Sequence, residues 1–159
     1  MKPSSLKTVI IRHRKENRKK CSLTPLEKNT DFEFICYPFS NDFILKPHVI
    51  LTLDAPPLTQ NDAILPLCLI DGTWNYAKIM ITQIEKQKQS HIYRSLPNTV
   101  ATAYPRKQTN CIDPARGLAS IEALYIAFKI LGINTENLLD NYFWKEDFLL
   151  NNQELLLHL

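Results

Sequence analysis

Leu67-Cys68-Leu69-Ile70-Asp71-Gly72-Thr73-Trp74 is typical of a buried strand that ends in a carboxylate and a glycine just before a helix begins. Residues 64–70 form an almost continuous apolar run, as expected of a strand covered on both faces. In open α/β sheets, ligands bind outside the carboxyl ends of such strands. Gly72 would allow a ligand to approach the backbone closely. Alternatively, Asp71 or Thr73 only caps the next helix, and the segment alone does not separate the two interpretations.

The flanking sequence predicts strands that alternate with helices. β-Branched and aromatic runs predict strands at residues 8–13, 32–37 and 49–53, and a short strand at residues 100–104. Apolar residues at helical spacing predict helices at residues 74–88 and 118–131, with Gly132 as the C-terminal stop. Residues 135–159 are predicted to form a helical tail of two segments, docked by Leu138, Leu139, Phe143, Phe148, Leu149 and Leu155. This alternation indicates an α/β fold around a mostly parallel sheet flanked by helices.

A second candidate site lies where the helix at residues 118–131 begins. Its apolar residues cover most of the circumference, so we expect this helix to be buried. The free N–H groups of a helix start can hold a carboxylate, and Ser120 adds a hydroxyl. The alternative is that Ser120 is an ordinary first-turn residue and Glu122 only favours the helix dipole.

Composition excludes several classes of protein. The 159 residues are enough for one domain with a core, and 45 % apolar and 22 % charged residues are ordinary for a globular chain. Three glycines and no GxGxxG or GxxxxGK[ST] argue against a Rossmann or P-loop nucleotide fold. The four cysteines form no CxxC pair and the four histidines are scattered, so we expect reduced thiols and no metal site. No apolar run is long enough for a membrane span.

Charge is distributed unevenly along the chain. Residues 1–28 hold nine Lys/Arg and two Glu, a net charge of +7, whereas the remainder has a net charge of −4. A basic segment of this kind suits a polyanion such as RNA, because neutralised phosphates release counterions. A solvated basic arm with no partner is the alternative.

Several motifs in one order resemble the DTW-domain superfamily, which includes ribosomal RNA and transfer RNA aminocarboxypropyltransferases. They are Arg12-His13, Lys20-Cys21-Ser22, Tyr37-Pro38, the segment at residues 69–74, Leu96-Pro97, Tyr104-Pro105-Arg106, residues 117–124 and the tail at residues 143–152. The resemblance covers most of the chain. It implies a single SPOUT-like domain over residues 1–159 with a C-terminal trefoil knot. The implied division is a basic segment at 1–30, an α/β core at 31–133 and C-terminal helices at 134–159.

The resemblance also implies the reaction. Enzymes of this family transfer the 3-amino-3-carboxypropyl group of S-adenosylmethionine (SAM) to a uridine or pseudouridine nitrogen in RNA and release methylthioadenosine. Applied to this chain, it implies SAM as co-substrate with no metal, a structured RNA as partner (ribosomal RNA favoured over transfer RNA) and a cytoplasmic monomer or homodimer.

Residue roles follow from the same resemblance. Asp71 is expected to hold the ammonium group of the cofactor as the catalytic residue, with a second possible role as base. The other expected cofactor-binding residues are Ser22, Ile70, Gly72, Trp74, Leu96, Arg116, Leu118 and Ser120. The expected RNA contacts are Arg12, Arg14, Lys19, Lys20, Arg106 and Lys107.

Two departures leave the RNA substrate open. The ribosomal branch usually carries Asn-Pro-Val-Asn-Tyr-Gly after its Leu-Pro, where this chain has residues 103–108, and the cysteine cluster of the transfer RNA branch is missing. Two other functions stay open from the sequence: a SPOUT-type RNA methyltransferase that uses the same cofactor, and an RNA-binding module without catalysis.

Overall fold

A five-stranded, all-parallel sheet forms the centre of the molecule. This computed structural model describes residues 6–105 and 117–159. The strands are β1 (Thr8–His13), β2 (Phe32–Tyr37), β3 (Val49–Leu51), β4 (Leu67–Asp71) and β5 (Ile92–Arg94), in the order β2-β1-β4-β3-β5. β4 lies in the middle, as its apolar run predicts. The α/β class, the parallel sheet and the bounds of β1 and β2 are confirmed.

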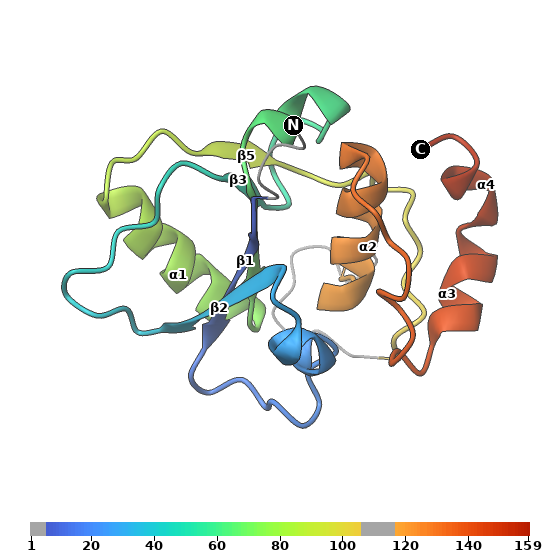
Figure 1. The fold of residues 1–159 in the computed structure, drawn as a ribbon, viewed down its shortest axis with the longest axis horizontal. Coiled ribbons are helices and arrows are strands. Elements are labelled where there is room, and N and C mark those ends of the chain that lie inside the picture. The colour runs from blue at the N-terminus through green and yellow to red at the C-terminus, as the bar shows by residue number, and fades with distance from the viewer. Residues whose placement is uncertain (1–5, 106–116) are drawn as a thin grey trace.

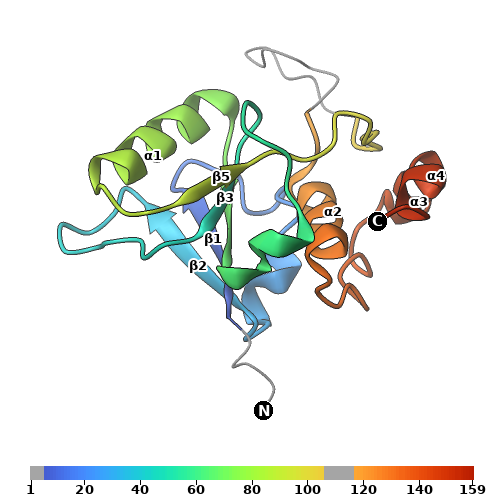
Figure 2. The same cartoon turned by 90° about the horizontal axis from the view of Figure 1, so that it is seen from above.

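Helices α1 (Trp74–Lys86) and α2 (Ser120–Leu131) lie on opposite faces of the sheet (Figures 1 and 2). Alternate residues of β1 divide between the two faces, because side chains on a strand point alternately up and down. Val9 and Ile11 pack with Met80 and Ile84 of α1, and Ile10 joins the cluster of α2. Both helices therefore bury an apolar face against the sheet, which stabilises the arrangement.

Two short 3-10 helices and the C-terminal helices complete the fold. They are η1 (Thr24–Lys28), η2 (Gln60–Ile64), α3 (Lys145–Asn151) and α4 (Gln153–Leu156). α2 ends at Gly132, whose φ of 73° is a left-handed conformation that glycine adopts without strain, as predicted. β1 belongs to the predicted 1–30 segment, so this segment contributes a sheet strand as well as basic residues.

The predicted strand at residues 100–104 is absent, and the reason is visible in the hydrogen bonds. The side chain of Asn152 donates to the carbonyl of Ala101 and accepts from its N–H, both at 2.8 Å. The N–H of Ala103 donates to Glu122 at 2.9 Å. Side chains therefore satisfy the backbone groups that a neighbouring strand would otherwise pair.

Other predicted elements differ at their ends. β3 stops two residues before the predicted end, and β4 begins at Leu67 because Ile64 lies in η2 and is 75 % exposed. In the tail, helix is confined to α3 and α4. Phe148 and Leu139 are buried there as predicted, whereas the docking role predicted for Phe143 is wrong, because its side chain is 86 % exposed.

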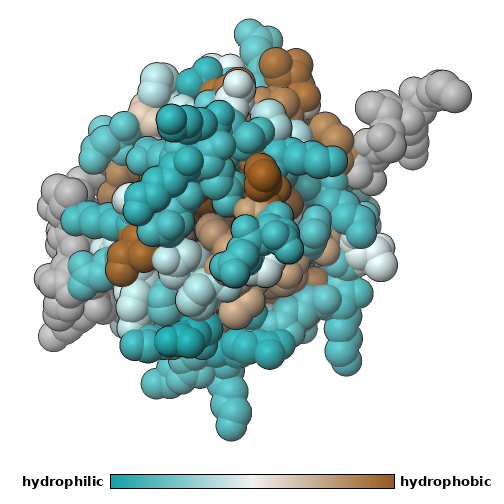
Figure 3. Space-filling view, turned by 90° about the vertical axis from the view of Figure 1, so that its left-hand side faces the viewer, coloured by the Kyte–Doolittle hydropathy of each residue, from teal (hydrophilic) through white to brown (hydrophobic). Residues whose placement is uncertain are grey.

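The side of the molecule that carries α1 is largely hydrophilic, with a few separate hydrophobic patches (Figure 3). Within residues 6–105 and 117–159, no helix is long and apolar enough to cross a membrane.

Because every strand is parallel, the carboxyl ends of all five lie at one edge of the sheet.

Candidate functional site

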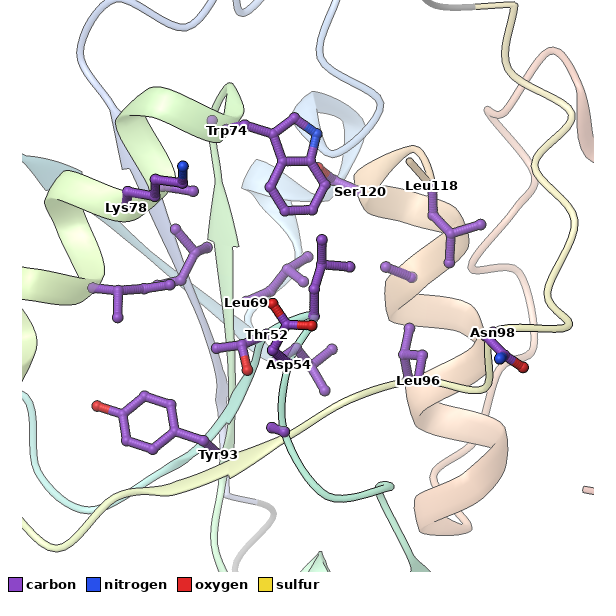
Figure 4. A pocket seen from close by; sticks show the side chains of 18 of the residues that line it. Thr52, Asp54, Leu69, Trp74, Lys78, Tyr93, Leu96, Asn98, Leu118 and Ser120 are labelled. Atoms are coloured by element: carbon purple, nitrogen blue, oxygen red, sulfur yellow. The ribbon is translucent and has the colours of Figure 1, made fainter. Parts of the chain in front are cut away.

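A pocket of about 580 Å³ opens at the carboxyl edge of the sheet. Residues at and after the ends of β3, β4 and β5 line it, one face of α1 forms one wall, and the start of α2 forms another (Figure 4). It is lined by Leu51, Thr52, Leu53, Asp54, Ala55, Pro56, Leu69, Ile70, Gly72, Trp74, Ala77, Lys78, Ile81, Glu85, Tyr93, Leu96, Pro97, Asn98, Val100, Leu118, Ser120 and Ala123. This is the place where ligands bind in open α/β sheets, and the volume is within the range of about 300–1,000 Å³ for small-molecule sites.

Six of the residues predicted to bind a cofactor line this one pocket: Ile70, Gly72, Trp74, Leu96, Leu118 and Ser120. The segments that carry them are distant in the sequence, and the parallel sheet brings them to one edge. Arg116 lies outside the described residues. Ser22 lies behind the wall, where its Oγ accepts a 3.1 Å hydrogen bond from the N–H of Ile121.

The start of α1 follows directly from β4. Thr73 is the N-cap residue, but neither it nor Asp71 makes a side-chain cap, so the capping interpretation of this segment is wrong. A Cβ atom at position 72 would lie 3.0 Å from Cε of Met80 and 3.4 Å from Cβ of Tyr76. A side chain here would press on the flexible end of Met80, and glycine avoids this contact where α1 begins close to the strand. Trp74 is half-buried and its indole projects over the pocket (Figure 4).

The start of α2 is fixed by Glu122, which is fully buried. Its carboxylate accepts from the N–H of Ala119 at 2.9 Å, from the N–H of Ala103 at 2.9 Å and from Oγ1 of Thr102 at 2.7 Å. Glu122 therefore does more than favour the helix dipole, because it ties the helix start to the segment before residue 105. Ser120 is thereby held with its hydroxyl at the pocket wall.

Asp71 lies behind this wall and is 3 % exposed. Its Oδ1 accepts from the Ser120 hydroxyl at 2.8 Å, and its Oδ2 accepts from Nε of Arg12 at 3.1 Å and from the thiol of Cys21 at 3.0 Å. Both carboxylate oxygens are therefore engaged inside the protein. The direct contact of Asp71 with a cofactor ammonium stays a prediction; in this structure Asp71 orients Ser120 and neutralises Arg12.

The cluster continues from Arg12 to the surface. Arg12 is 7 % exposed, and its guanidinium also pairs with Glu27, which in turn pairs with Arg18. Hydrogen bonds from Arg18 and Arg12 lower the pKa of Glu27. Arg12, which was predicted to contact RNA, therefore lies in the interior with its guanidinium bound to internal partners.

Cys21 is a hydrogen-bond donor in this cluster. Burial, together with the nearby Asp71 carboxylate, raises the pKa of its thiol to about 12. The thiol is therefore protonated at neutral pH, which makes it a poor nucleophile.

Exposed basic side chains follow β1 at the same edge of the sheet as the pocket. Arg14, Lys19 and Lys20 are all exposed, as a phosphate-binding role would require. Arg106 and Lys107 lie outside the described residues.

Several polar residues of the pocket were not predicted from the sequence. Thr52 and Asp54 follow β3, Tyr93 and Asn98 come from β5 and its loop, and Lys78 lies one turn into α1. β5 has only three residues, all half-buried, and their hydrophobicity shows no clear alternation. The sequence therefore does not predict this strand or the loop that follows it. The carboxylate of Asp54 directly after a predicted strand was the one available signal.

In the described part of the chain, no group of three or more His, Cys, Asp or Glu side chains is placed to hold a metal ion.

The fold is similar to a solved structure of known activity. That structure is the SAM-dependent rRNA acp-transferase Tsr3 from Vulcanisaeta distributa, with 26 % identity, a TM-score of 0.68, and coverage of 95 % of this chain and 81 % of that one. No known protein-family description matches the chain, and no curated protein matches it significantly.

Proposed function

We propose that this protein transfers the 3-amino-3-carboxypropyl group of SAM to N3 of a uridine or pseudouridine in structured RNA, and that methylthioadenosine is released. The observation that carries the proposal is the similarity to a SAM-dependent rRNA acp-transferase over 95 % of the chain. The position of the pocket adds to it, because residues expected to bind SAM meet there. Ribosomal RNA is favoured as substrate on the strength of the same similarity.

The lining of the pocket is compatible with SAM. Leucine, isoleucine, valine, proline and alanine side chains make up most of it, which suits an adenine ring, and Trp74 offers an aromatic face. The described charged side chains of the lining are Lys78, Asp54 and Glu85, one cation and two anions. SAM carries an ammonium, a sulfonium and a carboxylate, so the two sets of charges are complementary. The helix start at Ser120 suits the carboxylate of the amino-acid end.

Catalysis in this proposal depends mainly on orientation. When bound, SAM would supply an electrophilic carbon next to its sulfonium. The nucleobase nitrogen forms the new bond to this carbon, the C–S bond breaks with its electron pair going to sulfur, and the nitrogen gives its proton to water. The Ser120 hydroxyl donates its hydrogen to Asp71, so its oxygen is left as an acceptor for the ammonium group of the cofactor. Trp74 and the apolar lining exclude water from the reacting atoms.

The more detailed expectations that the family resemblance implies are part of the same proposal. They are the SPOUT-like class with a trefoil knot, the three-part division of a single domain, the cytoplasmic location and RNA contacts through Arg14, Lys19, Lys20, Arg106 and Lys107.

Product analysis tests the proposal directly. The purified protein is incubated with SAM and with ribosomal or transfer RNA from cells that lack the gene, and small molecules and nucleosides are analysed by mass spectrometry. We expect methylthioadenosine and an RNA nucleoside that has gained the aminocarboxypropyl mass. S-adenosylhomocysteine with a methylated nucleoside would identify a methyltransferase, and intact SAM with RNA binding would identify a non-catalytic module. Trp74→Ala should reduce turnover strongly, and Thr82→Ala on the exposed side of α1 serves as the matched control.

A further inference from the structure

The pocket wall formed by α1 carries a positive charge that the fold itself does not use. Lys78 is the one cation among the described residues that line the pocket, and its side chain is exposed. Thr82 donates from its hydroxyl to the backbone carbonyl of Lys78 at 2.9 Å. Within residues 6–105 and 117–159, however, the Lys78 ammonium makes no hydrogen bond or ion pair. Its charge is therefore available to a ligand.

The arginines of the neighbouring strands are engaged, in contrast. The guanidinium of Arg12 at the end of β1 pairs with Asp71 and Glu27. Arg94 at the end of β5 pairs with buried Asp62 at 3.0 Å and also donates to the carbonyl of Tyr93 at 3.0 Å. These two charges belong to the fold, whereas that of Lys78 does not stabilise any described part of it.

Lys78 stands at one end of the pocket. It follows Trp74 by one turn on the same face of α1, and residues four apart on a helix have Cβ atoms about 5–6 Å apart. Figure 4 shows both side chains at the end of the pocket where Ser120 lies. Glu85, the lining carboxylate of the same helix, is seven residues further, about 10 Å along the axis. The Lys78 charge is thus next to the place where, in the proposed function, the amino-acid end of SAM is held.

The acceptor base must reach this end of the pocket, because the reacting carbon belongs to the amino-acid end of SAM. The phosphates on either side of the acceptor nucleotide stay outside, since burial of a charged group in an apolar pocket is costly. A compact ammonium on a flexible stem at an exposed position suits such a phosphate. Arg14, Lys19 and Lys20, exposed at the same edge of the sheet, extend the positive surface.

On the basis of the proposed function, we propose that Lys78 contacts a phosphate beside the acceptor nucleotide and so positions the acceptor base against SAM. Lys78 is a positioning residue in this proposal, and it does not touch the reacting atoms. Arg14, Lys19 and Lys20 do not line the pocket. They supply affinity for RNA, whereas Lys78 supplies affinity together with alignment.

Lys78→Gln, which removes the charge and keeps most of the side chain, tests the inference. Fluorescence anisotropy with an rRNA fragment transcribed in vitro should show affinity weakened by about two- to fivefold and a slope of log affinity against log salt lowered by about 0.7–0.9. Calorimetry should show SAM affinity changed by no more than about twofold. With saturating rRNA from cells that lack the gene, methylthioadenosine formation should fall by about threefold or more, because the acceptor is less well aligned.

Two further variants separate the contact from general effects. Lys78→Arg should keep the salt slope, since arginine keeps the positive charge. Lys86→Gln is the matched control. Lys86 is exposed on the same helix but lies outside the pocket lining, eight residues and about 12 Å further along the axis. This control should change neither the salt slope nor turnover to the extent that Lys78→Gln does.

Three outcomes would overturn the inference. Weaker SAM binding with unchanged RNA affinity in Lys78→Gln would place the ammonium at the carboxylate of SAM. Unchanged turnover at saturating RNA would place the contact away from the acceptor. An equal loss of slope in Lys86→Gln would mean that only the overall charge of α1 matters. Failure of the proposed function itself is distinguishable, because the unmodified protein would then release no methylthioadenosine, whatever the RNA affinities of the variants.

Discussion

The hydroxyl of Ser120 donates a 2.8 Å hydrogen bond to Oδ1 of Asp71, which joins the first turn of α2 to the end of β4. The same carboxylate neutralises Arg12 and accepts from the thiol of Cys21. One residue of the pocket wall is therefore oriented by a buried group that does not line the pocket itself. A substitution at Asp71 should act on the site through structure and stability.

Asp71→Asn is expected to destabilise the fold. The change removes the charge that neutralises buried Arg12, although Glu27 remains as its second partner. Breaking a buried pair costs about 3 kcal/mol of unfolding free energy at the low end of the usual range, and the melting temperature should fall by about 10 °C. Urea unfolding and thermal melting measure the effect. Asp140→Asn, which breaks the exposed pair with Lys145, is the control and should cost less than about 1 kcal/mol; equal losses in the two variants would contradict the structural role.

Cys21 should resist alkylation at pH 8 in the folded protein. Its thiol has a pKa of about 12, raised mainly by burial, so almost no thiolate is present to react. Peptide mass spectrometry after iodoacetamide treatment should find exposed Cys36 modified and Cys21 unmodified until urea is added. Rapid modification of folded Cys21 would show that the thiol is not held as described.

The same thiol makes stability depend on alkaline pH. The unfolded thiol ionises near its ordinary value of 9.0, whereas the folded thiol stays protonated up to about 12. The folded state therefore binds more protons than the unfolded state between pH 9 and pH 12. The contribution of Cys21 to the unfolding free energy should be greatest below pH 9 and should decrease as the pH rises from 9 toward 12. Urea titrations at a series of pH values should show that the unfolding free energy of Cys21→Ser changes less with pH. If the variant loses as much stability as the unmodified protein at alkaline pH, other groups cause the loss.

Trp74 should report cofactor binding through its fluorescence. Its indole projects over the pocket, whereas the second tryptophan, Trp144, stacks edge-on against Phe143 beside α3. Adding SAM or methylthioadenosine should change the emission of the protein and of Trp144→Phe in a saturable way. Trp74→Phe should lose this response. A response that disappears with Trp144 instead would locate the ligand elsewhere.

The exposed cations after β1 should supply a salt-dependent part of RNA affinity. Replacing Arg14, Lys19 and Lys20 by Gln should lower the slope of log affinity against log salt by about 0.7–0.9 for each phosphate contact that is lost. Fluorescence anisotropy with a ribosomal RNA fragment measures the slope. Lys7, Lys28 and Lys46 are matched controls, because they are exposed and precede β1, β2 and β3, at the opposite edge of the sheet. If the two triple variants lower the slope of log affinity against log salt by the same amount, RNA binding is not confined to the pocket edge.

Glu122→Gln should loosen the start of α2. The carboxylate accepts from three donors, and an amide in its place has one oxygen and would turn an NH₂ group toward a donor. Leaving a buried donor unsatisfied costs about 1–3 kcal/mol, which urea unfolding detects. Hydrogen exchange at the amides of Ala103 and Ala119 should also accelerate. Exposed Glu136→Gln is the control, and slow exchange in the Glu122 variant would contradict the role given to this side chain.

The longer elements of this fold could be predicted because their patterns are strong. β1, β2, β4 and the two long helices carry apolar runs or helical stripes that depend on local sequence. β5 could not be predicted, since three half-buried residues leave no clear periodicity. The strand predicted at residues 100–104 failed because Asn152 and Glu122, distant in the sequence, satisfy its backbone.

The candidate site shows the same division between local and distant information. Local sequence identified Trp74, Gly72 and Ser120, which do line one pocket. Local sequence could not reveal that Arg12 and Cys21 shield Asp71, since these partners lie 59 and 50 residues away. The same limit concealed Asp54, whose place in the pocket depends on the pairing of its loop with β5.

Glu122 holds Ala103 on one side of residues 106–116 and Ala119 on the other. The two ends of that span are thus attached to a single carboxylate, and the position of α2 does not depend on how many residues lie between them. Lengthening such a span adds little closure entropy, about 0.6 kcal/mol for each doubling. The start of α2, which brings Ser120 to the pocket wall, is anchored by a carboxylate of the same helix and is therefore inherited independently of the length of chain between Ala103 and Ala119.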